Sequence, residues 1–209
     1  MFHALLSFAV VAGLLTIVPG LDTALVLRAA VTRSRRHAFA TALGIGSGTL
    51  IWGAAAAAGI SAVLTASNLA YMLLRIVGAI YLIWMGASML RAALRRSPAT
   101  IRSPENDSAR TVLGAWACGL GTNLLNPKVG VFYMAMIPQF IPPDTPQLPM
   151  GIALAALHNL EGMLWFTAII LAAGSAKSWF DREEVRRILD GLTGTVLIAF
   201  GVKLASDRR

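Results

Sequence analysis

The chain has 209 residues, of which 56% are hydrophobic and 13% are charged, with a formal net charge of +8 and a mean hydropathy of +0.68. A soluble domain carries roughly twice that charged fraction, so this composition excludes an ordinary globular core and indicates several membrane spans. The positive charge does not indicate a nucleic-acid partner, because the arginines lie between apolar runs.

The first apolar run has no positively charged leader segment and no small-x-small cleavage site, so we expect a retained span and not a removed signal peptide. Within it, "VPGLDTALVL" places Pro19 and Gly20 shortly before Asp22. This order predicts a broken helix, with Asp22 in the first turn of a new half-helix. Two interpretations of Asp22 are open: a cap that faces interfacial water, or a carboxylate that lines a transport pathway.

The second apolar run contains "LGIGSGTLIWGAAAAAG", which resembles a phosphate loop only superficially, because no strand precedes it and no lysine follows. We interpret its small residues, with Gly44 and Gly48 among them, as a face that lets membrane helices approach closely. In the third run, Arg75 either extends its side chain to the outer surface or attracts anions into an outer vestibule. Both interpretations of Arg75 are open.

The stretch "RRSPATIRSPENDSAR" is the only long polar segment rich in proline and serine, and it predicts a mobile cytoplasmic linker. It divides a single transporter domain, 1–209, into a first three-span half (1–90), the linker (91–111) and a second three-span half (112–209). An odd number of spans in each half makes the halves enter the membrane from opposite sides. That topology is the one of an inverted repeat.

The fourth apolar run contains "NLLNPKVGVFY". Pro127 removes the helical partner of the Asn123 carbonyl, and the side chains of Asn123 and Asn126 can satisfy backbone groups around the break. Lys128 lies too far from either end of the run to reach water easily. Either Lys128 pairs with Asp22 and holds two half-helices together, or its ammonium faces an anionic group in an aqueous cavity. The two interpretations are compatible, because a salt bridge between Lys128 and Asp22 could exchange partners during a transport cycle.

The fifth apolar run contains "ALHNLEGMLWF", where His158 and Glu161 are three positions apart and therefore share a helix face. A buried glutamate is suited to binding a proton, because burial disfavours its charged form. We expect Glu161 to handle a proton and His158, like Arg75, to line a polar vestibule. The alternative is that both are polar contacts between helices. No spacing matches a metal motif, so we expect no metal and no cofactor.

Six runs are long enough to cross a bilayer at about 20 residues each, and such runs must be helical in lipid because a lone strand leaves its backbone groups unpaired. They lie near 2–26, 39–64, 69–90, 112–137, 148–173 and 185–205. Basic residues gather after the first span, after the third and before the sixth, so both termini are predicted outside. Because Lys203, Arg208 and Arg209 then lie outside too, a five-span arrangement also stays open.

The pattern therefore predicts an all-α integral membrane protein. We expect six transmembrane helices arranged as two inverted three-helix halves, with the first helix of each half broken at a proline, Pro19 or Pro127.

These motifs resemble those of the LysE/RhtB family of amino-acid exporters. "VPGLDTALVLRAAVTRSRRHAFATALGIGSGTLI" resembles the opening of that family, "RIVGAIYLIWMGASMLR" its third span, and "GLGTNLLNPKVGVFYMAMIPQFI" its Asn-Pro-Lys element followed by Pro-Gln-Phe. Leu21 is a departure, because the family usually has a second proline there, and we expect a milder break. The resemblance implies importance for Pro19, Gly20, Asp22, Asn126, Pro127 and Lys128. Glu161 occupies a place where acidic residues are common in the family.

The resemblance implies secondary-active efflux of an amino acid or a derivative, by proton antiport, across the cytoplasmic (inner) membrane of a bacterium. Rocking of one predicted half against the other would give alternating access. A free amino acid needs one negative and one positive partner. We hypothesise that Asp22 holds its amine and that Lys128, with freed amides near Pro127, holds its carboxylate. Asn123 and Asn126 are expected to contact the substrate as well. Glu161, together with Asp22, would handle the proton. The expected partners are the substrate, protons and membrane lipid but no nucleic acid, and a homo-oligomer stays open.

Other classes compete with this hypothesis. A passive channel is open, and so is a membrane-embedded protein without a transport role. A membrane enzyme is not expected, because no nucleophile–base or metal spacing is present. A thiol-redox carrier needs two cysteines, and the chain has only Cys118. The sequence does not identify the substrate, so basic, branched, sulfur-containing and homoserine-like amino acids all stay open.

Overall fold

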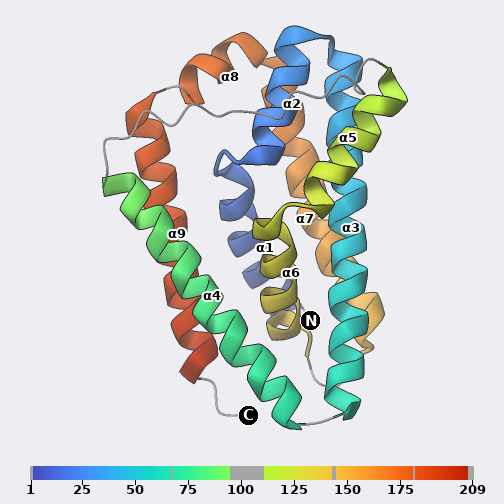
Figure 1. Ribbon diagram of the computed structural model, residues 1–209, viewed down its shortest axis with the longest axis vertical. Coiled ribbons are helices and arrows are strands. Elements are labelled where there is room, and N and C mark those ends of the chain that lie inside the picture. The colour runs from blue at the N-terminus through green and yellow to red at the C-terminus, as the bar shows by residue number, and fades with distance from the viewer. Residues whose placement is uncertain (1, 67, 95–110, 143–144, 181, 207–209) are drawn as a thin grey trace.

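A computed structural model describes residues 2–66, 68–94, 111–142, 145–180 and 182–206, and the predicted cytoplasmic linker stretch 95–110 lies outside these ranges. Within them the chain is helical and contains no strand (Figure 1), so the prediction of an all-helical protein is confirmed for the described residues. The helices are α1 (Phe2–Ile17), α2 (Leu21–Thr32), α3 (Arg35–Ala66), α4 (Asn68–Leu94), α5 (Val112–Leu124), α6 (Pro127–Phe140), α7 (Gln147–Leu171), α8 (Ala173–Phe180) and α9 (Glu183–Ser206).

Three helical stretches in the described part of the chain are long and apolar enough to cross a membrane: Arg35–Gly59, Ile76–Leu94 and Gln147–Leu171. The pair α1 and α2 makes a fourth if it forms one span, with a bend of 54° at its break. Helices α5 and α6 have 13 and 14 residues, so neither is long enough alone. Six spans in two inverted halves therefore stay a prediction.

Two helix breaks interrupt the bundle. Helix α1 ends at Ile17, and α2 starts at Leu21 with Gly20 as an extended N-cap residue. Helix α5 ends at Leu124, and α6 starts at Pro127. A proline is favoured at the first position of a helix, because its missing N–H would have no helical partner there in any case.

The helices pack as a bundle with α1 and α6 in its middle (Figure 1). The pair α4 and α9 lies side by side on one flank, and α3 packs on α5 and α7 on the other. One apolar core joins α1, α3, α4, α6, α7 and α9 around Phe8, Phe132 and Leu82. A second core joins α2, α3 and α7 around Val26 and Ile170. The two helix breaks lie between these cores, and so does a cavity that residues of both cores line.

Glycines allow the close approach of α3 and α5. A Cβ placed on Gly44 would meet the backbone of Trp116, and one placed on Gly119 would meet the carbonyl oxygen of Thr41. A Cβ on Gly48 would likewise meet the side chain of Asn123. The prediction that Gly44 and Gly48 form a face for close helix packing is therefore confirmed.

Candidate functional site

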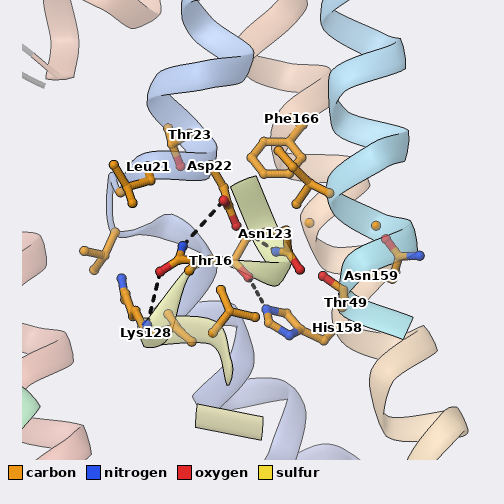
Figure 2. Close-up of a pocket in the computed structure, with 18 residues that line it drawn as sticks. Thr16, Leu21, Asp22, Thr23, Thr49, Asn123, Lys128, His158, Asn159 and Phe166 are labelled. Atoms are coloured by element: carbon orange, nitrogen blue, oxygen red, sulfur yellow. Dashed lines mark hydrogen bonds between the residues drawn. The ribbon is translucent and has the colours of Figure 1, made fainter. Parts of the chain in front are cut away.

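A cavity of about 70 Å³ lies where the two helix breaks meet (Figure 2). Its apolar walls come from both cores, with Leu15 and Val129 from the first and Ile45 and Phe166 from the second. Its polar lining comes from α1, α2, α3, α5, α6 and α7: Thr16, Asp22, Thr23, Thr49, Asn123, Asn126, Lys128, His158 and Asn159. Since roughly 10–15 Å³ of such space holds one water molecule, the cavity has room for a small polar molecule.

The Asp22 carboxylate, in the first turn of α2, accepts hydrogen bonds from the α5–α6 break. Asn123 Nδ2 donates to one carboxylate oxygen at 2.9 Å, and Asn126 Nδ2 lies 3.5 Å from the other. The second bond is at the long limit for a hydrogen bond and is therefore the weaker. The two asparagines thus hold the start of α2 against the break between α5 and α6.

Asn126 also begins α6, because its side-chain oxygen accepts a hydrogen bond of 3.1 Å from the backbone N–H of Lys128. One asparagine therefore caps a helix with its oxygen and contacts Asp22 with its nitrogen. Asn123 is 1% exposed, and its Oδ1 has no hydrogen-bond partner among the described residues. The sequence predicted that both asparagine side chains would hydrogen-bond backbone groups at the break. Of the two, Asn126 makes such a bond, to the backbone N–H of Lys128.

The Lys128 ammonium lies against the break between α1 and α2. A Cβ built on Gly20 would stand 3.9 Å from Lys128 Nζ. The charges of Asp22 and of Asp190, on α9, both act on this ammonium. The hydrogen bonds that Asp22 accepts in the described part of the chain come from Asn123 and Asn126. Asp22 and Lys128 thus line the same cavity, and the Asp22 carboxylate accepts its hydrogen bonds from two asparagine amides.

His158 lies in a hydrogen-bonded chain that runs from α6 through α7 to α1. Thr16 Oγ1 donates to the carbonyl of Ala12 at 2.9 Å, so it accepts from His158 Nε2 at 3.0 Å. His158 Nδ1 then accepts from the Tyr133 hydroxyl at 2.7 Å. The tautomer follows from this order, since a carbonyl can only accept. Both ring nitrogens of His158 are thus already engaged within the protein.

Glu161 does not line the cavity. Its carboxylate lies beside α1, where a Cβ placed on Gly13 would stand 3.8 Å from each oxygen. Glu161 Oε2 is buried and has no hydrogen-bond partner among the described residues. His158 and Glu161 are on the same helix, but the structure places only His158 in the cavity.

Several lining residues were not identified from the sequence, among them Thr16, Thr49 and Asn159. Asn159 carries a usable signal, because an amide inside a predicted span is unusual and stands next to His158. The side chain of Arg75 lies outside the described part of the structure. Within that part, no group of three or more His, Cys, Asp and Glu side chains could hold a metal ion.

Comparisons with known proteins agree on one family. The sequence matches the LysE type translocator family over residues 13–208. It is 30% identical to the threonine efflux protein of Salmonella typhi, over 91% of each chain. It is 28% identical to the uncharacterized membrane protein YrhP of Bacillus subtilis, over 96% of this chain and 98% of the relative. It is 27% identical to the leucine efflux protein of Klebsiella pneumoniae, over 96% of this chain and 94% of the relative. No solved structure gives a significant match.

Proposed function

Because the chain belongs to the LysE type translocator family and is a multi-pass membrane protein, we propose that it exports an amino acid or an amino-acid derivative. Export runs across the cytoplasmic membrane, with both termini outside. Relatives named as threonine and leucine efflux proteins support this substrate class. The observation that carries the proposal is the cavity between the two helix breaks, which Asp22 and Lys128 line together.

Asp22 binds the ammonium group of the substrate in this proposal. An ionised carboxylate has about four lone-pair sites, and the two asparagine amides occupy two of them. The remaining sites can accept hydrogen bonds from an ammonium group without breaking the contact between the helices. Binding the substrate also supplies the positive charge that a partly buried carboxylate needs.

The carboxylate of the substrate binds between Lys128 and the start of α2. Gly20, the N-cap residue of α2, has no side chain that could cap the first N–H groups of the helix, which leaves these groups for a ligand. Lys128 Nζ lies beside the same residue. The start of a helix attracts anions through its N–H groups and its dipole, and interrupted membrane helices use their ends in this way.

Transport in this proposal is proton antiport with alternating access. Glu161 binds the counter-transported proton, because its buried oxygen has no hydrogen-bond partner among the described residues and is costly to leave charged. Two proline-associated breaks, one in each half of the chain, support an inverted repeat in which one half rocks against the other.

The experiment that tests the proposed function uses an export-deficient bacterial host. Cells with and without the protein are loaded with a panel of dipeptides, which they hydrolyse to free amino acids. We expect the protein to lower the accumulation of at least one released amino acid, with an export rate that saturates as the internal concentration rises. Equal accumulation for every dipeptide would contradict amino-acid export, and flux without saturation would favour a channel.

A further inference from the structure

Most polar groups of the cavity already have partners inside the protein. Asp22 accepts from Asn123 and Asn126, while His158 and Thr16 bond to each other and to groups further from the cavity. Within the described part of the chain, the Lys128 ammonium makes no hydrogen bond, and neither do the side chains of three uncharged lining residues: Thr23, Thr49 and Asn159. A neutral polar group that is already hydrogen-bonded within the protein adds little for a ligand, whereas an uncommitted one gains from the arrival of a ligand. Asp22 differs from the neutral groups, because its carboxylate keeps lone pairs that the two asparagines do not use.

Two of these side chains, Thr49 and Asn159, lie together and away from the charged end of the cavity, which is the part that Asp22 and Lys128 line. Asn159, on α7, contacts α3 so closely that a Cβ on Gly46 would meet its amide oxygen. Thr49 follows Gly46 by three positions and so lies on the same face of α3. Figure 2 shows Thr49 and Asn159 on the α3 side of the cavity, with Lys128 on the other side.

The third side chain, Thr23, belongs to the charged end of the cavity. It follows Asp22 on α2, and Figure 2 shows it above Asp22 and apart from Thr49 and Asn159. Ile45 and Phe166 also line the cavity, so Thr49 and Asn159 are polar groups set among apolar walls. This division gives the cavity one end for the two charges of an amino acid and another for its side chain.

We infer that Thr49 and Asn159 form a side-chain subsite that selects small amino acids whose side chain carries a hydrogen-bonding group. The inference rests on the proposed function, because it assumes that Asp22 and Lys128 hold the ammonium and carboxylate groups. A hydroxyl or amide on the substrate side chain completes the hydrogen bonds of Thr49 and Asn159. An aliphatic side chain of the same shape leaves them without partners and removes them from any water present.

Threonine and valine provide the sharpest comparison, because they have nearly the same shape and differ by a hydroxyl in place of a methyl group. Export of each is measured side by side after loading with the matching dipeptides. We expect wild type to favour threonine. Thr49→Val and Asn159→Leu should each lower the threonine-to-valine export ratio about two- to tenfold, as expected for the loss of one hydrogen bond.

Two further variants control for structural damage. Thr49→Ser keeps the hydroxyl and should keep the ratio. Thr41→Val makes the same chemical change on the same helix, at a residue that is 2% exposed and does not line the cavity, and should also leave the ratio unchanged. The amount of each variant in the membrane is measured in parallel, so that a ratio is compared only between proteins that are present.

The possible outcomes separate the two proposals. Export of threonine and valine at equal rates by wild type would overturn the subsite while leaving amino-acid export intact. The subsite is also overturned if neither Thr49→Val nor Asn159→Leu changes the ratio. If no amino acid of the panel is exported, the proposed function fails and the subsite fails with it. A ratio that falls in both variants and survives in Thr49→Ser supports the subsite.

Discussion

Asn123 donates a 2.9 Å hydrogen bond to the carboxylate of Asp22, although the two residues are 101 positions apart in the sequence. The bond joins the end of α5 to the start of α2 and so brings both helix breaks to one cavity. A conformational change that separates the two helix breaks must therefore break this hydrogen bond, unless Asp22 and Asn123 move together. The residues of the proposed substrate site thus also form the contact between α2 and the break between α5 and α6.

The first prediction concerns the negative charge of the site. Asp22→Asn keeps the size of the side chain but removes the charge that would hold a substrate ammonium. We expect the export rate to fall at least about tenfold, because hydrogen bonds to charged groups contribute roughly 1.5–3 kcal/mol. Export is measured in dipeptide-loaded cells, and the amount of protein in the membrane is measured by immunoblot. Export at the wild-type rate would remove Asp22 from the site.

Glu184→Gln is a suitable control for this change. Glu184 is exposed at the start of α9 and does not line the cavity. Removing its charge should leave export at the wild-type rate. A comparable loss in both variants would indicate a general effect of charge on insertion and not a specific site.

The second prediction concerns the positive charge. Lys128→Met keeps an unbranched side chain of similar length but removes the ammonium beside Gly20. We expect export to fall at least about tenfold, because the substrate carboxylate loses its counter-charge and Asp22 is left as an unbalanced charge. Steady-state export by the variant is compared with that of Lys128→Arg, which keeps the charge in a larger group and should retain part of the activity. Full export by Lys128→Met would mean that another group binds the carboxylate.

Particular residues show how far the sequence allowed the site to be predicted. Asp22 and Lys128 stand out because a charge within an apolar run has few structural explanations, and the structure places both at one cavity. Thr49 does not stand out, because threonines are common in membrane helices and only the rotation of α3 decides which of them faces the cavity. That rotation depends on glycine contacts such as that between Gly46 and Asn159, which need the tertiary structure.

The fold, like the site, could be predicted from the sequence only in part. Long apolar runs predict helices well, because a backbone in lipid has no other partner for its polar groups. Helix α8 is not predicted as a separate element, since eight residues form no periodic pattern and its start lies at the end of a predicted span. Helix α7 ends at Leu171 and α8 begins at Ala173, and the sequence has no proline between them that would mark this boundary.

The third prediction uses two glycines of α5 as a matched pair. A Cβ on Gly119 would meet the backbone of Thr41, whereas a Cβ on Gly121 would meet no atom of the described residues within 4 Å. Gly119→Ala should therefore push α5 away from α3 and lower the thermal stability of the purified protein. Gly121→Ala should leave it unchanged or raise it, because alanine favours a helix by up to about 1 kcal/mol over glycine. Thermal unfolding in detergent measures both, and equal shifts would contradict the close contact between α3 and α5.

The fourth prediction concerns proton coupling at Glu161. Glu161→Gln keeps the shape of the side chain beside Gly13 but cannot exchange a proton. Export is measured in inside-out vesicles with and without a proton gradient. Wild type should accumulate substrate against its gradient and stop when a protonophore is added. Glu161→Gln should move substrate only down its own gradient and at a rate that the protonophore does not change, because the carrier no longer binds the proton.

The control for proton coupling is again Glu184→Gln, which changes an exposed carboxylate and should behave as wild type in the same vesicles. Uphill transport by wild type that persists with the protonophore would exclude proton antiport. A normal response of Glu161→Gln would instead assign the proton to another carboxylate. Asp22 is then the next to test, because it already lies at the cavity, where binding of a proton and binding of a substrate ammonium would compete directly.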